Sequence, residues 1–179
     1  MDPDARKGWV VDVALARLQA TGVPLTTLED LAGAANLDEA ELRTLFGDEE
    51  GMMRELVSPL LERLREITAS AATTDLRQGA QVREVVERYL DALVAHRTLA
   101  GVVLGDPTAS SSEAVRLVRA EILGLRDELA GGSGGDLDQR IRAASALGAV
   151  HAAVLEFADF EPTTVRDVIT DAAVAIILS

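Results

Sequence analysis

Few side chains in this sequence could carry out chemistry. The 179 residues include no cysteine and only two histidines, His96 and His151, which excludes disulfides, thiolate catalysis and zinc sites built on cysteine. Neither histidine lies in a Ser-His-Asp arrangement or at a metal-ligand spacing from carboxylates, and no phosphate-binding loop or dinucleotide fingerprint occurs. The sequence therefore predicts no enzyme activity, no catalytic residue, no metal site and no cofactor.

The residues near the end of one apolar segment are suited to binding a ligand. His96 and Arg97 follow Tyr89 and Leu93 in a segment of strong helical periodicity, so we expect all four to line a pocket with otherwise apolar walls. Alternatively, His96 and Arg97 cap the helix C-terminus and Tyr89 packs in the core. Aromatic residues make up 3% of the chain, which favours an aliphatic or otherwise hydrophobic effector. We expect the pocket to lie between three predicted helices, at 51–70, 80–97 and 113–130.

Apolar residues recur at helical spacing along almost the whole chain. A first helix ends before Gly22, and a second opens with a capping box in which Thr26 caps the amide of Glu29. Asp38 caps a third helix that ends near Phe46. Three helices in about 40 residues, the last two joined by a short turn, are typical of a helix-turn-helix unit.

The rest of the chain is predicted to form a helical bundle. We therefore expect an all-α fold of about nine helices, with a helix-turn-helix domain at 1–50 and a ligand-binding and dimerisation bundle at 51–179. The longest uncharged apolar stretch, 172–178, is far shorter than the roughly 20 residues that span a bilayer. With no signal-peptide pattern either, the expectation is a cytoplasmic protein without a membrane partner.

The last two predicted helices, 137–158 and 163–178, carry residues suited to a subunit interface. Small residues on the first would let two helix axes approach closely, and the apolar stripe on the second needs a cover. We therefore expect a two-fold homodimer through a four-helix bundle, with His151 as a satisfied interface histidine. The predicted interface residues are Ala144, Ser145, Gly148, His151, Ala152, Leu155, Val165, Ile169, Ala172 and Ile176.

Two segments of the predicted helix-turn-helix, Ala35 to Asp38 and Leu42 to Phe46, follow one another without a gap in an order of signals that extends from residue 10 to residue 56. This order resembles the TetR family of bacterial one-component regulators, which has Ala-Gly-Val-Ser at the first segment and Leu-Tyr-x-His-Phe at the second. The resemblance implies that the third helix enters the DNA major groove and that the C-terminal bundle binds a small molecule. It also implies that the last two helices pair with a second subunit, and that ligand binding releases operator DNA.

The N-terminal unit departs from the family pattern in its charge. Residues 1–50 hold four basic and eleven acidic residues, net −7, in a chain of net charge −13. The family's phosphate-contacting tyrosine aligns with Arg43, but its lysine at the start of the fourth helix aligns with Glu49. The third helix opens with Asp38, Glu39 and Glu41, which stabilise its N-terminus but repel a polyanion.

Two functions fit these observations. In the first, the protein is a repressor that binds operator DNA and is released by a small hydrophobic effector, with Glu39 or Glu41 accepting from cytosine N4. In the second, it has the same fold but has lost DNA binding, and it binds a ligand or a partner. For Arg43 itself, the alternative to a DNA contact is a surface arginine paired with Glu39 or Glu50. The resemblance favours the first function and the charge favours the second. The DNA-binding residues predicted by the first are Arg6, Lys7, Arg17, Thr26, Thr27, Glu39, Glu41, Arg43 and Thr44.

Overall fold

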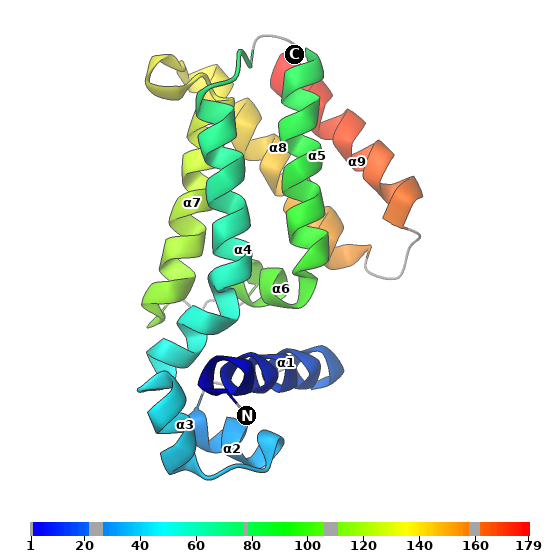
Figure 1. Ribbon diagram of the computed structural model, residues 1–179. Coiled ribbons are helices and arrows are strands. Elements are labelled where there is room, and N and C mark those ends of the chain that lie inside the picture. The colour runs from blue at the N-terminus through cyan, green and yellow to red at the C-terminus, as the bar shows by residue number, and fades with distance from the viewer. Residues whose placement is uncertain (1, 22–26, 77–78, 106–110, 158–161) are drawn as a thin grey trace. The chain divides into compact units, whose positions relative to one another are not determined.

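The computed structural model describes residues 2–21, 27–76, 79–105, 111–157 and 162–179. In this part of the chain the regular structure is helical throughout and contains no strand (Figure 1), which confirms the predicted all-α fold. A short 3-10 helix, Gly132–Gly134, follows the seventh α-helix. The α-helices are α1 (Pro3–Thr21), α2 (Leu28–Ala35), α3 (Glu39–Phe46), α4 (Glu49–Ala72), α5 (Gly79–Ala95), α6 (Arg97–Gly105), α7 (Glu113–Leu129), α8 (Leu137–Glu156) and α9 (Pro162–Leu178).

The chain forms two compact units, and the long helices α4 and α7 contribute to both. The first unit comprises Met1–Pro59 and Thr98–Leu117, and the second comprises Leu60–Arg97 and Val118–Ser179. Each unit therefore combines segments that are distant in sequence. The division into a helix-turn-helix domain at 1–50 and a ligand-binding and dimerisation bundle at 51–179 stays a prediction.

Helices α1, α2 and α3 pack against one another in the first unit. Their shared core is made of aliphatic side chains, among them Val10, Leu28 and Leu42, which are fully buried. Asn36 ends α2 in the left-handed conformation, at φ 51° and ψ 47°, which asparagine tolerates better than most residues. The turn from Asn36 to Asp38 therefore sets α3 against α1 and α2 in the predicted helix-turn-helix arrangement.

The caps of these helices confirm one prediction and correct another. The Asp38 carboxylate accepts a hydrogen bond from the Ala40 amide at 3.0 Å and begins α3, as predicted. The predicted cap of α2 was wrong by one residue, because the N-cap is Thr27, whose hydroxyl accepts a hydrogen bond from the Asp30 amide at 3.1 Å. Thr26 itself lies outside the described residues.

In the second unit, α9 packs on both α5 and α8. Two ion pairs join α5 to α9, one between Arg83 and Asp171 and one between Asp91 and Arg166. Because the partner of the later α5 residue comes earlier in α9, the two helices are antiparallel. Within the described ranges, no helix combines the length and apolar character needed to cross a membrane.

Candidate functional site

Helix α3 carries four of the nine side chains that the sequence predicts to contact DNA, and each of its three charged side chains forms an ion pair. Arg43 donates two hydrogen bonds to one Glu39 oxygen, at 3.0 Å from Nε and 2.6 Å from Nη2, which confirms the predicted alternative that Arg43 pairs with Glu39. The hydrogen bond and the negative charge of Glu39 raise the pKa of Arg43. Thr44 donates to the Ala40 carbonyl at 2.9 Å.

The cations of α1 are paired in the same way. Arg6 forms an ion pair with Glu41 of α3, and Lys7 forms one with Glu55 of α4. The Lys7 ammonium also lies 5.7 Å from the centre of the Phe46 ring. Arg17 is exposed and has no ion pair with a described residue. The carboxylates of α3 and α4 therefore offset three of the four cations in residues 1–50.

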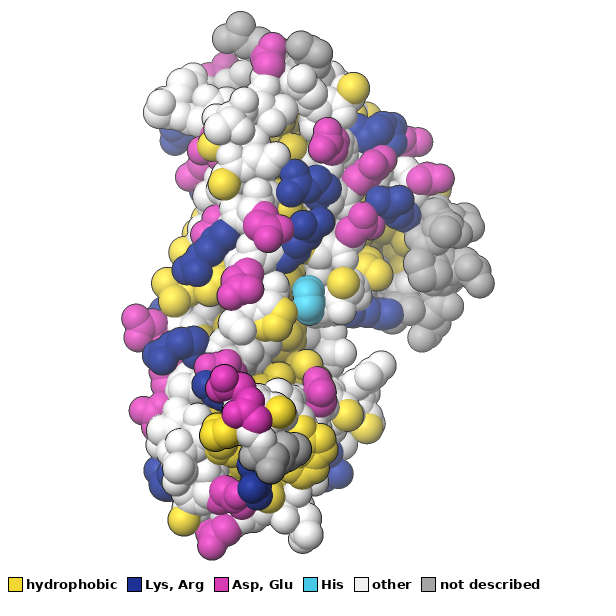
Figure 2. Space-filling view, viewed as in Figure 1, with side chains coloured by type: hydrophobic (Ala, Val, Ile, Leu, Met, Phe, Trp, Pro, Cys, Tyr) yellow, Lys and Arg dark blue, Asp and Glu magenta, His cyan; other side chains and the backbone are white. Residues whose placement is uncertain are grey.

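Figure 2 shows acidic side chains interspersed with the basic ones over the visible face. Such a surface differs from the continuous basic patch by which many proteins bind the phosphate backbone non-specifically. Residues 1–50 hold four basic residues, and three of these form ion pairs, so any DNA contact made by the first unit must depend on a few cations and on base edges.

Glu50 forms a link within the first unit that the sequence did not predict. Its carboxylate accepts hydrogen bonds from the backbone amides of Ala114 at 2.7 Å and Glu113 at 3.2 Å, and from the Ser112 hydroxyl at 3.3 Å. Glu50 therefore caps the N-terminus of α7 from the first turn of α4, immediately after the predicted DNA-reading helix. A carboxylate is favoured there because it faces the positive end of the helix dipole.

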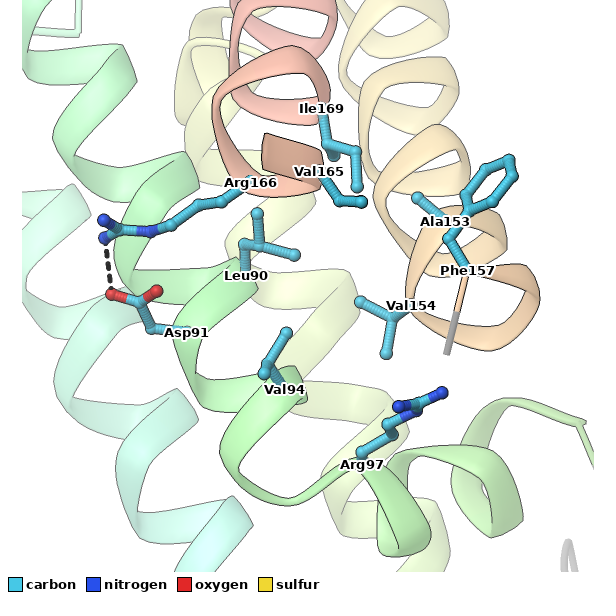
Figure 3. A pocket seen from close by; sticks show the side chains of 10 residues that line it. All are labelled: Leu90, Asp91, Val94, Arg97, Ala153, Val154, Phe157, Val165, Arg166 and Ile169. Atoms are coloured by element: carbon cyan, nitrogen blue, oxygen red, sulfur yellow. Dashed lines mark hydrogen bonds and ion pairs between the residues drawn. The ribbon is translucent and has the colours of Figure 1, made fainter. Parts of the chain in front are cut away.

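A cavity of about 100 Å³ lies between α5, α8 and α9 in the second unit (Figure 3). Aliphatic side chains, among them Leu90, Val94 and Val154, form most of its walls. Its polar groups are Arg97, Arg166 and Asp91, and Nη2 of Arg166 donates to the Asp91 carboxylate at 2.8 Å. In Figure 3 the Arg97 guanidinium lies at one end of the space between α5 and α8.

The predicted ligand-binding residues occupy different environments. Arg97 lines the cavity, but Tyr89 and Leu93 are fully buried in the core, and His96 is half-buried with its pKa lowered by that burial. The cavity in Figure 3 uses α8 and α9, whereas the predicted pocket uses helices 51–70, 80–97 and 113–130. Binding by these four residues stays a prediction.

Tyr89 and His151 meet between α5 and α8. The Tyr89 hydroxyl and the His151 Nε2 are hydrogen-bonded, and the ring centres are 5.8 Å apart. Burial raises the pKa of Tyr89 and lowers that of His151 to about 4. The pair is therefore neutral near pH 7 and satisfies two polar groups inside an aliphatic core.

The residues predicted to form a subunit interface divide into two groups. On α8, Ala144, Ser145, Gly148, Ala152 and Leu155 are exposed, and His151 is half-buried beside them. Leu137 and Ile141, which are 74% and 55% exposed, extend this stripe toward the start of α8. The same helical spacing could have revealed both from the sequence. On α9, Ala172 is exposed and Ile176 is half-buried, whereas Val165 and Ile169 line the cavity.

No protein-family profile and no curated protein sequence matches the chain. Several solved structures, by contrast, are similar to the chain over most of its length. The regulator PfmR from Thermus thermophilus is 18% identical with a TM-score of 0.66, over 94% of this chain and 96% of that one. A putative fatty acid metabolism regulator from Clostridium perfringens is 19% identical with a TM-score of 0.68, over 95% and 98%.

A third similar structure contains a ligand. FadR from Bacillus subtilis, in complex with stearoyl-CoA, is 14% identical with a TM-score of 0.64, over 94% of this chain and 97% of that one. PfmR is a TetR-family transcriptional regulator. The similarity extends over nearly the whole of each chain at low sequence identity, and it is therefore a similarity of fold. The chain has the fold of the TetR-family transcriptional regulators.

Proposed function

We propose that the protein is a TetR-like transcription regulator, a repressor that binds operator DNA as a homodimer and is released by a small hydrophobic effector. The observation that carries the proposal is the helix-turn-helix formed by α2 and α3, with its Asn36 turn and Asp38 cap, in a chain of TetR fold. No catalytic role is proposed for any residue, in keeping with regulators of this fold.

DNA would be read by α3 and its neighbours. Arg43 is the only cation on α3 and is exposed on the helix surface, so it is the first candidate for a guanine or a phosphate. Glu39 or Glu41 would accept from cytosine N4 once its arginine has moved to the DNA. Arg6, Lys7, Arg17, Thr26, Thr27 and Thr44 would supply the remaining contacts.

The homodimer is supported by the exposed stripe on α8. Large apolar side chains at Leu137, Ile141 and Leu155 flank the small residues Gly148 and Ala152 at helical spacing. An exposed apolar stripe of this kind marks an interaction surface, and small residues allow close approach of a symmetry-related helix. A two-fold four-helix bundle of α8 and α9 from each subunit would cover it.

The effector is supported by the cavity between α5, α8 and α9 and by the similar structures. Its walls are largely aliphatic and offer no aromatic ring for stacking except Phe157. Relatives by fold include a putative fatty acid metabolism regulator and a regulator bound to stearoyl-CoA. An effector with an aliphatic part suits both observations.

A second function is favoured by the ion pairs of the helix-turn-helix. Arg43, Arg6 and Lys7 each have a carboxylate partner, which would weaken attraction to phosphate. In this alternative the protein keeps the fold and binds a ligand or a partner without DNA.

Selection from a random DNA pool at about 50 mM salt, where weak phosphate contacts count most, separates the two functions. The regulator is expected to enrich a pseudo-palindrome, and Arg43→Ala is expected to lose it. Arg63→Ala is the matched control, because Arg63 also pairs with a glutamate on its own helix but lies in the second unit. Enrichment of no sequence by the folded protein would support the second function.

A further inference from the structure

We propose that the cavity between α5, α8 and α9 binds a small uncharged aliphatic molecule of about four to six carbons, held by apolar contacts alone. The inference deepens the proposed effector site and rests on that function for its regulatory meaning. The binding itself can be measured without DNA.

The walls of the cavity are aliphatic on every side. Each of the three helices contributes two aliphatic side chains, and in Figure 3 Leu90 of α5 and Val154 of α8 lie on opposite sides of the space. The six side chains are Leu90, Val94, Ala153, Val154, Val165 and Ile169. Contact with such walls replaces water by apolar surface, which favours a ligand made of methyl and methylene groups.

The charged side chains beside the cavity are already engaged. Arg166 donates to the Asp91 carboxylate at 2.8 Å, and in Figure 3 this ion pair lies on the far side of Leu90 from the apolar space. Arg97 has an interaction partner as well. A carboxylate or an ammonium group inside the cavity would therefore lose its hydration without gaining an ion pair, whereas an uncharged molecule avoids this cost.

The cavity has a buried end and an exposed mouth. Leu90, Ala153 and Val154 are buried, whereas Val94 and Phe157 are 45% and 50% exposed. A ligand can therefore enter past Val94 and Phe157 without opening the core. Because exposed apolar side chains around a concave site favour an interaction, the mouth also gains by being covered.

The size of the cavity limits the ligand. Its volume of about 100 Å³ is somewhat less than that of a dry cavity of about 150 Å³, which holds a six-carbon ring. A compact molecule of a few carbons fits this space, and a bulky aliphatic cage does not.

Methyl NMR spectroscopy of the full chain with 3-methylbutan-1-ol tests the proposal. We expect saturable shifts of the methyl groups of Leu90, Val94 and Val154, with a dissociation constant of about 5 mM or tighter, which ligand efficiency allows for six non-hydrogen atoms. Leu125 is fully buried and does not line the cavity, so its methyl groups should not shift. The absence of saturable shifts up to about 50 mM, about tenfold above the expected constant, would overturn the proposal.

Three related molecules test the charge and the size of the ligand. The anion 3-methylbutanoate and protonated 3-methylbutan-1-amine have the same branched skeleton, and each should bind at least about tenfold more weakly than the alcohol. Adamantan-1-ol is uncharged and aliphatic but much bulkier, and it should also bind at least about tenfold more weakly. Binding of any of the three as tight as that of 3-methylbutan-1-ol would overturn the proposal.

Two variants change the space in opposite directions. Ala153→Leu fills the cavity, so 3-methylbutan-1-ol should bind at least about tenfold more weakly. Ile169→Ala enlarges it, so adamantan-1-ol should bind at least about fivefold more tightly than to the unmutated protein. Ile169→Ala keeps the test decisive if Ala153→Leu does not fold, because unchanged or weaker binding of adamantan-1-ol by it contradicts the proposal.

Ala95→Leu is the matched control. Ala95 is exposed on α5 directly after Val94 and does not line the cavity. The same added bulk should therefore change the affinity for 3-methylbutan-1-ol by less than about twofold. A loss as large as that of Ala153→Leu would contradict the assignment of the site.

Two further outcomes separate the ligand site from the rest of the account. If 3-methylbutan-1-ol binds to a monomeric Ala152→Glu variant but not to the unmutated protein, a second copy of the chain covers the cavity and the proposal is wrong. If 3-methylbutan-1-ol binds as expected while DNA selection fails, the ligand site stands and the regulatory function is wrong. If DNA is selected but 3-methylbutan-1-ol does not bind, only the ligand proposal is wrong.

Discussion

Neutralising Glu39 and Glu41 together should free two cations of the helix-turn-helix for DNA. In the protein Glu39 holds Arg43 and Glu41 holds Arg6. The double variant Glu39→Gln, Glu41→Gln removes both carboxylates and leaves side chains of the same size. We therefore expect tighter non-specific binding to a random-sequence duplex and a stronger dependence on salt.

The expected change follows from the number of cations released. Each phosphate neutralised contributes about −0.9 to the slope of log affinity against log salt, so two freed arginines per subunit should steepen the slope by about 1.8 per subunit. Between 50 and 200 mM salt, the variant should thus lose about tenfold more affinity per subunit than the unmutated protein. Folding should change little, because exposed ion pairs contribute about 0–1 kcal/mol each to stability.

Fluorescence anisotropy with a labelled duplex at several salt concentrations measures both slopes. The matched control is Glu66→Gln, which removes a carboxylate paired with Arg63 in the second unit. The control lowers the net negative charge without releasing a cation on α1 or α3. If the double variant shows the same slope as Glu66→Gln, the ion pairs do not limit DNA binding and the reasoning is refuted.

Three further predictions concern the link from α4 to α7, the buried histidine and the subunit interface. Glu50→Ala removes the cap of α7 and should lower the free energy of unfolding by about 1–2 kcal/mol, whereas Glu49→Ala should change it by less than about 0.5 kcal/mol; equal denaturation midpoints for the two would contradict the capping role. Burial lowers the pKa of His151 to about 4, so below the unfolded value of about 6.5 only the unfolded state gains the proton, and stability falls as pH falls from about 6.5 to 4. Because glutamine does not titrate, the free energy of unfolding of His151→Gln should fall by up to about 3 kcal/mol less over this pH range than that of the unmutated protein. If the two proteins lose stability in parallel as pH falls, His151 is not the cause. Ala152→Glu places a charge in the exposed stripe of α8 and should convert the dimer into a monomer, which light scattering measures. If light scattering shows that the unmutated protein is a monomer, the proposed interface is wrong.

Local signals in the sequence were sufficient to predict the helices but not every cap. Asp38 immediately precedes the apolar pattern of its helix, and the structure confirms it as the cap. Before α2, however, Thr26 precedes Glu29 by three residues and Thr27 precedes Asp30 by three. Both pairs satisfy the same capping pattern, and only the folded backbone selects the second.

The candidate sites were less predictable because they depend on contacts between distant segments. Glu39 and Arg43 are four residues apart on one helix, and their pair follows from helical geometry. Glu50 and Ala114 are 64 residues apart, and nothing near either residue in the sequence indicates the contact. The cavity likewise combines residues 90–97 with 153–157 and 165–169, so its position depends on how three helices pack.

Footprinting of the protein on genomic DNA fragments that it retains at about 50 mM salt is the most direct test of DNA reading. A dimer with one α3 in each of two successive major grooves should protect two patches centred one helical turn, about 34–36 Å, apart. Arg43→Ala should abolish both patches while leaving the protein folded. Uniform or absent protection by the folded, unmutated protein would contradict the claim that this helix-turn-helix reads DNA.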